Sequence, residues 1–341
     1  MLAFITGVAG PALTGEERQF LKEAEPWGLI IFKRNIVDAA SLRRLIDDFR
    51  ALVGRQAPVL VDQEGGRVAR LGPPHWPSYP PGAAYGALYD RDREMGLAAA
   101  KLGGRMIATD LAAVGIDVDC APIADVPVAG ADPIIGDRAY GTEPAKVAAI
   151  AGAIASGLEE GGVLPVLKHI PGHGRATADS HDKLPVVTTD RATLEATDFA
   201  AFRQLKALPL GMTAHVVFTA IDPVAPATTS VTIVQDVIRD SIGFSGLLMS
   251  DDISMGALSG TLGDRTKAAI TAGCDMILHC NGKMTEMLEV AAATPQLAGD
   301  AARRAAAALA MRRPATPIDL TAARAAFSKV MAGVAPAPGS A

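Results

Sequence analysis

Eight short apolar runs, separated by longer segments with helical spacing, limit the possible folds more than any other feature of this sequence. The runs are continuously apolar rather than alternating, as expected when both faces of a sheet are covered by helices. They cover residues 2–6, 29–32, 59–62, 116–122, 164–169, 210–215, 247–250 and 276–279. Helical patterns include residues 40–52, 93–114, 144–160, 191–205, 231–241 and 266–272.

Eight strand–helix units predict one α/β domain, a single (β/α)8 TIM-type barrel. The alternative is a doubly wound open sheet, but no G-x-G-x-x-G follows the first strand, so a dinucleotide-binding version has little support. Further helices are expected at residues 301–313 and near residues 320–331. We therefore predict a catalytic barrel with C-terminal helices over residues 1–332 and a flexible tail over residues 333–341.

Composition excludes several classes of protein. Hydrophobic residues make up 49% of the 341 residues, which is enough for a large core. A net charge of -5 gives no basic surface for nucleic acid. The three cysteines form no C-x-x-C pair, and the apolar start has no basic region and is interrupted by glycines. We expect a cytoplasmic protein without a signal peptide, membrane helix or disulfide, and a monomer or weak oligomer.

Polar residues follow several predicted strands, and in a barrel of this kind the carboxyl ends of the strands form the active face. Charged groups placed there lie in a cleft, where low dielectric strengthens their interaction with a ligand. The residues at these ends are Asp62, Lys168, His169, His215, Ser250, Asp251, Asp252 and His279.

The densest polar run covers residues 168–181 and holds three of the six histidines. The spacing of His169 and His173 is compatible with a metal pair on a helix, but Pro171, Gly172 and Gly174 break any helix there. A metal site and a purely structural role for the histidines both stay open. We also expect the glycines to make residues 171–181 mobile without ligand, so that this loop gates the site.

Two further observations suggest acid/base chemistry. Asp179 and His181 are two residues apart, so the carboxylate can orient the imidazole ring and raise its basicity. Asp251 follows a buried strand and can serve as a nucleophile or an electrostatic stabiliser. From the pattern alone, Asp252 is nearly as good a candidate, with a helix cap as its other possible role.

The run K-H-I-P-G-H-G-x-x-x-x-D-S-H, residues 168–181, resembles the long signature of the β-N-acetylglucosaminidases of glycoside hydrolase family 3. Residues 62–70 (D-Q-E-G-G-R-V-x-R), 135–138 (I-G-D-R) and 250–255 (S-D-D-I-S-M) are also similar to segments of this family, in the same order. The resemblance extends from about the first strand to about residue 310.

The resemblance implies a single barrel that removes terminal, non-reducing N-acetylglucosamine with retention of configuration. It assigns the nucleophile to Asp251 and the acid/base role to His181, partnered by Asp179. It also implies that five residues hold the sugar: Asp62, Arg70, Arg138, Lys168 and His169. Single-domain members are typically cytoplasmic enzymes acting on N-acetylglucosaminyl-1,6-anhydro-muropeptides in cell-wall recycling, so the expected partner is a small carbohydrate or muropeptide and no cofactor is expected.

Two alternatives belong to other classes. One is a metal-dependent barrel hydrolase that uses His169, His173, Asp179 and His181 as ligands. The other is a sugar-binding protein that kept the fold and lost the chemistry, although the presence of Asp179, His181 and Asp251 argues against it.

Overall fold

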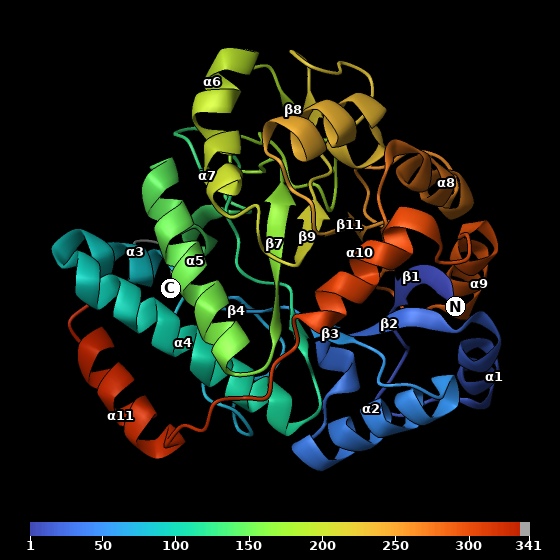
Figure 1. Ribbon diagram of the computed structural model, residues 1–341, viewed down its shortest axis with the longest axis horizontal. Helices are drawn as coiled ribbons and strands as arrows, with labels where there is room; N and C mark the ends of the chain where they lie inside the picture. Colours follow the sequence, from blue (N-terminus) through green and yellow to red (C-terminus); the bar gives the residue numbers. More distant parts are fainter. Residues whose placement is uncertain (335–341) are drawn as a thin grey trace.

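The computed structural model describes residues 1–334 and contains a closed parallel barrel of eight strands, in the order β1-β12-β11-β9-β7-β6-β3-β2 (Figure 1). This arrangement confirms the predicted (β/α)8 barrel. The barrel strands are β1 (Leu2–Thr6), β2 (Pro26–Ile31), β3 (Val59–Val61), β6 (Val118–Asp119), β7 (Leu164–Ile170), β9 (Leu210–Thr213), β11 (Leu247–Asp252) and β12 (Met276–His279). Each contains or overlaps one of the eight apolar runs.

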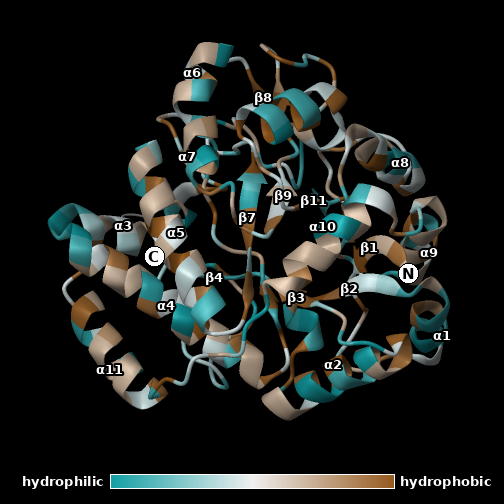
Figure 2. Cartoon of the chain, viewed as in Figure 1, coloured by the Kyte–Doolittle hydropathy of each residue, from teal (hydrophilic) through white to brown (hydrophobic). Residues whose placement is uncertain are grey.

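Helices surround the barrel, and Figure 2 shows that many of them carry hydrophobic and hydrophilic residues on different sides. They are α1 (Gly15–Ala24), α2 (Ala39–Val53), α3 (Gly82–Arg91), α4 (Arg93–Ala113), α5 (Pro144–Glu160), α6 (Arg191–Ala196), α7 (Asp198–Gln204), the π-helix η4 (Ile233–Ser241), α8 (Leu262–Ala272), α9 (Met284–Ala293), α10 (Gly299–Ala310) and α11 (Leu320–Met331). Helix α11 packs against α4, on the outside of the barrel (Figure 1).

Local sequence signals explain where these helices begin and end. Helix α2 begins after Asp38, whose carboxylate accepts the backbone N–H of Ser41 over 2.7 Å. It ends at Gly54, which adopts a left-handed conformation with φ of 66°. Residues 191–205 were expected to form one helix, but the structure divides them into α6 and α7 at Thr197, which has the non-helical angles φ -119° and ψ -81°.

Two apolar layers lie on the two faces of the barrel sheet. Alternate strand residues such as Ile5, Leu60, Val166 and Met249 fill the barrel interior, and the intervening residues pack against the helices. Every second side chain of a barrel strand therefore points towards the barrel axis. This alternation decides which polar residues at the strand ends point into the open end of the barrel.

Short sheets and turns cover the open end of the barrel. Strands β4 (Gln63–Gly65) and β5 (Val68–Ala69) form an antiparallel pair after β3, and β8 (Val186–Val187) pairs with β10 (Val217–Phe218) in parallel. Within residues 1–334, no helix is long and apolar enough to cross a membrane. The predicted tail, residues 333–341, falls mainly outside the described part of the chain, so its flexibility stays a prediction.

Candidate active site

Strand alternation brings three charged side chains into the open end of the barrel. Asp62, Lys168 and Asp251 each lie two residues beyond an interior residue, namely Leu60, Val166 and Met249. All three charged residues line one cavity of about 320 Å³. Each of these charged residues thus continues the series of side chains that point into the barrel interior. The apolar layers beneath them exclude water from the base of the cavity.

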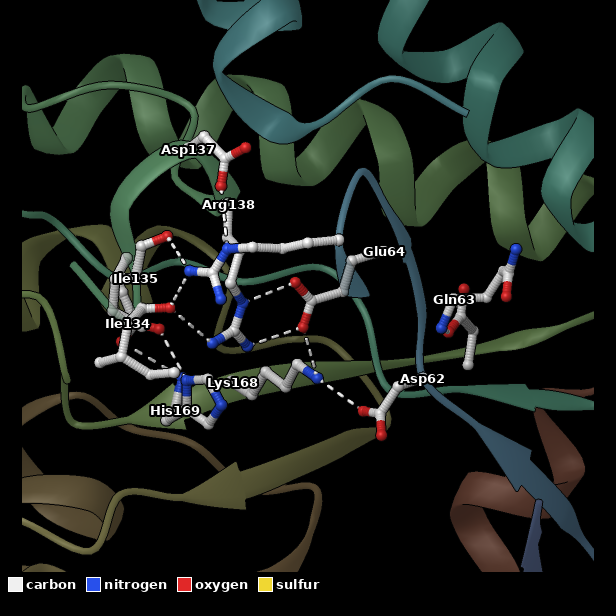
Figure 3. A network of polar contacts seen from close by, with 12 residues as sticks. Asp62, Gln63, Glu64, Ile134, Ile135, Asp137, Arg138, Lys168 and His169 are labelled. Atoms are coloured by element: carbon white, nitrogen blue, oxygen red, sulfur yellow. Dashed lines mark hydrogen bonds and ion pairs between the residues drawn. The ribbon is translucent and has the colours of Figure 1, made fainter. Parts of the chain in front are cut away.

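Asp62, Lys168, Glu64 and Arg138 form a continuous ion-pair network (Figure 3). The Nζ atom of Lys168 lies 2.8 Å from Oδ1 of Asp62 and 2.7 Å from Oε1 of Glu64. Arg138 donates two hydrogen bonds to Glu64, of 2.9 and 2.8 Å. Arg70 donates to the other oxygen of Asp62 over 2.8 Å. The network fixes three cationic side chains in the geometry of a rigid donor array, which suits a hydroxyl-rich ligand.

Neighbouring groups of opposite charge decide the ionisation state of each residue in this network. Burial alone would raise the pKa of Asp62, but Lys168 and Arg70 hold it well below its usual value. For Glu64, burial is likewise opposed by Arg138 and Lys168, which lower the pKa to about 2. Burial would lower the pKa of Lys168, yet Asp62 and Glu64 raise it instead. The network is therefore fully charged at neutral pH.

His169 is held by a carboxylate that the sequence analysis did not identify. Its Nδ1 atom lies 2.7 Å from Oδ2 of Asp125, which is fully buried. Burial would raise the pKa of Asp125, but His169 and His173 lower it, so the carboxylate is ionised and only accepts. The proton of a neutral His169 consequently sits on Nδ1, and Nε2 is left to bind a ligand in the cavity.

The same carboxylate connects to the loop after β7. Asp125 also accepts the backbone N–H of His173 over 2.6 Å, and Nε2 of His173 lies 3.0 Å from the hydroxyl oxygen of Ser180. Burial, with a smaller contribution from His169, lowers the pKa of His173 to about 4, so this imidazole is neutral at pH 7. His173 thus positions the loop just before His181.

Asp179 and His181 form the predicted pair. The Nδ1 atom of His181 lies 2.7 Å from Oδ1 of Asp179, and the same oxygen accepts the backbone N–H of His181 over 2.9 Å. Burial would raise the pKa of Asp179, but these two hydrogen bonds lower it. The carboxylate therefore holds the proton of His181 on Nδ1. His181 lines the cavity and its side chain is 63% exposed, so Nε2 is accessible for proton transfer.

Backbone contacts hold this pair beside the end of β11. The backbone N–H of Gly256 donates to the carbonyl of His181 over 3.0 Å, and that of Ala257 donates to Ser180 over 3.1 Å. Both donors follow Asp251 and Asp252 by only a few residues. The loop that carries His181 and the segment that follows Asp251 are thus joined directly.

The structure distinguishes Asp251 from Asp252. Asp251 continues the interior row of β11, whereas the carboxylate of Asp252 accepts hydrogen bonds from Ser254 and from the backbone N–H of Cys280. Burial would raise the pKa of Asp251, but nearby His169 and His215 lower it, which keeps an anion available. Asp252 lines the same cavity, but its oxygens are largely occupied.

His215 supports the end of β11 from below. It is fully buried, its Nδ1 atom lies 2.7 Å from the hydroxyl oxygen of Thr228, and its Nε2 atom donates to the carbonyl oxygen of Asp252 over 3.0 Å. His279 is also buried and pairs with Glu286 over 3.0 Å. Neither histidine lines the cavity, so both of these strand-end residues have supporting positions.

The structure does not bring His169, His173, Asp179 and His181 together as one ligand set. His169 contacts Asp125, His173 contacts Ser180, and His181 contacts Asp179. Within residues 1–334, no group of three or more His, Cys, Asp or Glu side chains has the geometry to hold a metal ion. The alternative of a metal-dependent hydrolase therefore gains no support from the geometry.

The glycines of the loop after β7 allow close packing against neighbouring segments, in addition to any contribution to loop mobility. A Cβ atom on Gly174 would lie 2.2 Å from the carbonyl oxygen of Val126. Gly172 has φ of 145°, and its Cβ would lie 3.2 Å from that of Asp198. Replacing both glycines would therefore disturb the packed loop itself, so such a variant does not isolate the predicted gating motion.

Sequence reasoning missed several residues of the site. Glu64 and Ser180 lie inside the quoted motifs, but their roles depend on partners distant in the sequence: Arg138 and Lys168 for Glu64, and the fold of the loop for Ser180. Asp125 follows the fourth apolar run as the first acidic residue after Pro122. Extending the strand-end rule by three residues would have found it.

Together these features define a class of protein: a barrel enzyme whose polar, carbohydrate-sized cavity is lined by an aspartate and by the histidine of a histidine–aspartate pair. Comparisons with known proteins agree. The family described as "Glycosyl hydrolase family 3 N terminal domain" matches residues 4–308. The chain belongs to this family.

Individual relatives carry more specific names. A "Beta-hexosaminidase" of Alkalilimnicola ehrlichii is 41% identical over 281 residues, covering 81% of this chain and 79% of the relative. Another, of Aromatoleum aromaticum, is 37% identical over 278 residues, covering 80% and 78%. The comparisons thus confirm the prediction of a glycoside hydrolase of the β-hexosaminidase type.

Solved structures are similar over nearly the whole chain. The NagZ of Neisseria gonorrhoeae in complex with N-trifluoroacetyl-D-glucosamine superimposes with a TM-score of 0.86 and 30% identity, covering 96% of this chain and 98% of that one. A family 3 β-N-acetylglucosaminidase of Paenibacillus has a TM-score of 0.85 at 26% identity, covering 96% and 67%. The barrel and the helices around it are thus shared with solved hydrolases of this family.

Proposed function

We propose that this chain is a retaining β-N-acetylhexosaminidase that releases terminal, non-reducing N-acetylglucosamine from N-acetylglucosaminyl-1,6-anhydro-muropeptides in cell-wall recycling. One observation carries the chemistry: Asp251 enters the cavity that His181 lines, and Asp179 orients His181. The names of the β-hexosaminidase relatives support the proposed sugar, and the structural similarity extends over 98% of the Neisseria NagZ chain.

The first step forms a glycosyl-enzyme. An oxygen of Asp251 attacks the anomeric carbon while Nε2–H of a protonated His181 donates its proton to the departing glycosidic oxygen. The C–O bond to the leaving group breaks as the ester bond to Asp251 forms. Asp179 stabilises the imidazolium before this transfer and keeps the remaining proton on Nδ1 afterwards.

The second step returns the enzyme to its starting state. Neutral His181 accepts a proton from water at Nε2, the water oxygen attacks the anomeric carbon, and Asp251 leaves as a carboxylate. Two inversions at one carbon give net retention. The imidazole here takes the role that a second carboxyl group has in most retaining glycosidases, and a neutral base places no negative charge near the glycosyl-enzyme.

In this proposal, the ion-pair network at the base of the cavity and His169 bind the sugar. Asp62, Arg70, Arg138, Lys168 and His169 all line the cavity. Arg70, Arg138 and Lys168 are positioned by carboxylates before any ligand arrives, so little side-chain entropy is lost on binding. We further expect a cytoplasmic monomer or weak oligomer.

Two measurements test the proposal. The enzyme should release p-nitrophenol from p-nitrophenyl β-N-acetylglucosaminide far faster than from the β-glucoside. A 2-fluoro glycosyl inhibitor should then label Asp251, identified by mass spectrometry of the digested protein. Labelling of Asp252, or activity lost on chelation and restored by zinc, would overturn the assignment. A substrate-assisted enzyme would leave no labelled aspartate.

A further inference from the structure

The side chain of Arg175 connects the loop after β7 to the junction of α6 and α7. Its Nε–H donates to Oδ2 of Asp198 over 2.5 Å, and an Nη2–H donates to the hydroxyl oxygen of Thr197 over 2.9 Å. Of residues 174–178, only Arg175 forms a side-chain hydrogen bond within the described part of the chain. The first half of this loop is therefore attached to the helical layer by one guanidinium group.

The two acceptors of Arg175 lie together because the helix is interrupted. Thr197 has the non-helical angles that end α6 and begin α7. Its hydroxyl oxygen lies 2.8 Å from Oδ2 of Asp198 and 2.6 Å from the carbonyl oxygen of Thr193. In a continuous helix, successive side chains would point about 100° apart around the axis. The interruption instead gives Arg175 a hydroxyl group and a carboxylate side by side.

Asp198 is buried, and the loop encloses it. Its side chain is 1% exposed, and its Oδ1 atom has no hydrogen-bond partner within residues 1–334. A Cβ atom on Gly172 would lie 3.4 Å from this oxygen, so the loop packs against the carboxylate as well as pairing with it. Burial raises the pKa of Asp198, and the hydrogen bonds from Arg175 and Thr197 oppose this only in part. Without Arg175, a buried carboxylate would lose its cationic partner, which is costly.

Short contacts lead from Arg175 to His181. His173 lies two residues before Arg175, and its Nε2 atom lies 3.0 Å from the hydroxyl oxygen of Ser180, the neighbour of His181. The ring of His181 contacts Asp179, which belongs to the same loop. The position of the imidazole in the cavity therefore depends on how the loop itself is fixed to the barrel and its helices.

We propose that Arg175 is a positioning residue for the acid/base histidine: by binding Asp198 and Thr197 it fixes the loop after β7, so that Nε2 of His181 reaches the glycosidic oxygen. Arg175 does not line the cavity, so it acts through the loop. A displacement of about 1 Å can lower the rate of a catalysed step about 10²-fold. This inference rests on the proposed function and adds the contact that places its acid.

The test compares two substrates that carry the same sugar. Methyl β-N-acetylglucosaminide has a poor leaving group that needs a proton, whereas p-nitrophenyl β-N-acetylglucosaminide needs little proton donation. For Arg175→Gln we expect kcat/KM to fall by about tenfold or more on the methyl glycoside and by less than about twofold on the p-nitrophenyl glycoside. A purely structural role would lower both values equally, so an unchanged ratio of the two would overturn the proposal.

Conservative variants carry the test if Arg175→Gln folds poorly. Arg175→Lys keeps the charge but lacks the planar group that reaches both acceptors, so its ratio should lie between those of the wild type and Arg175→Gln. Asp198→Asn keeps the size of the acceptor and removes its charge, and should shift the ratio in the same direction. In the double variant the shift should be smaller than the product of the two single shifts, because both substitutions break one contact. Shifts that multiply would show that the two residues act separately and would contradict the proposal.

Two further variants locate the cause of a failure. Arg191→Gln removes a guanidinium group that is 49% exposed and paired with Glu195 on α6, and it should leave the ratio unchanged. An equal shift in this control would show that the effect is not specific to the Arg175 contact. His181→Ala should shift the ratio most. No shift in His181→Ala would overturn the proposed acid role and this inference with it, whereas a shift there but none in Arg175→Gln, Arg175→Lys and Asp198→Asn would overturn the positioning role alone.

Discussion

Asp125 binds His169 from the side away from the cavity, with 2.7 Å between Oδ2 and Nδ1. This contact fixes the tautomer of His169, and the same carboxylate also accepts the backbone N–H of His173. Asp125 therefore links a residue that lines the cavity to the loop that carries His181. Since Asp125 does not line the cavity, it acts as a positioning residue.

Asp125→Asn should raise KM for p-nitrophenyl β-N-acetylglucosaminide by about tenfold, because His169 loses the acceptor that orients it. The amide also removes a buried charge from charge-assisted hydrogen bonds, which should cost about 1–3 kcal/mol of unfolding free energy. Steady-state kinetics and urea unfolding measure both. Asp300→Asn, at an exposed site, is the control. A variant with unchanged KM and reduced stability would limit Asp125 to a structural role.

Glu64 should make the stability of the protein depend on acid pH. Its pKa falls to about 2 in the folded protein from 4.5, so its contribution is fully present above about pH 4.5 and is lost as pH falls towards 2. The linked free energy is on the order of 3 kcal/mol. Glu64→Gln should be less stable at pH 7, since Arg138 and Lys168 lose their shared partner.

Urea unfolding between pH 7 and pH 3 checks this prediction. The difference in unfolding free energy between the wild type and Glu64→Gln should shrink as the pH falls through the window. Parallel curves for the two proteins would show that Glu64 does not titrate as the ion pairs require.

Gly174→Ala should destabilise the loop after β7, because its Cβ would lie 2.2 Å from the carbonyl oxygen of Val126 and the backbone would have to shift. We expect a loss of about 2 kcal/mol or more. Gly72→Ala is a matched control, since a Cβ there would meet nothing within 4 Å. Thermal unfolding of both variants measures the difference; equal melting temperatures would show that the loop adjusts freely.

The barrel was predictable because its signal is local. Each barrel strand coincides with a continuous apolar run, and residues in the middle of β7 or β11 need no distant partner to be recognised as buried. The break at Thr197 and the π-helical turns of η4 were not predicted, since one-residue changes in helical hydrogen bonding leave the apolar spacing nearly intact.

The site was predictable in its residue types and less so in its partners. Strand-end position and the family resemblance identified Asp62, Lys168 and Asp251, and alternation along the strand would have favoured Asp251 over Asp252 without a structure. The contacts of Glu64 with Arg138 and of Asp125 with His169 join residues 74 and 44 positions apart. Pairings at such separations are set by the closed barrel and leave no pattern in the sequence.

Asp251→Ala should lower kcat by at least about 10³, because it removes the proposed nucleophile. Asp252→Ala should retain much more activity, but it should lose stability, since Ser254 and the backbone N–H of Cys280 lose their acceptor. Initial rates and melting temperatures separate the two effects. A larger loss of kcat in Asp252→Ala than in Asp251→Ala would reverse the two assignments.

His181→Ala should slow both chemical steps, because in the proposed mechanism its imidazole donates a proton in the first step and accepts one in the second. The loss in the first step should be smaller for a p-nitrophenyl sugar, whose leaving group needs little proton donation, than for a disaccharide. Asp179→Ala should show a weaker form of the same pattern, since the ring remains but loses the contact of 2.7 Å that orients it.

Azide provides the decisive measurement on His181→Ala. As a small anionic nucleophile it attacks the glycosyl-enzyme without a base, so it should restore the second step and yield a β-glycosyl azide, detectable by mass spectrometry and NMR. The wild type, which keeps the proposed base, should gain little from azide. If good and poor leaving groups were affected equally and no glycosyl azide formed, His181 would be a binding or structural residue, and the base would have to be sought among the other residues lining the cavity.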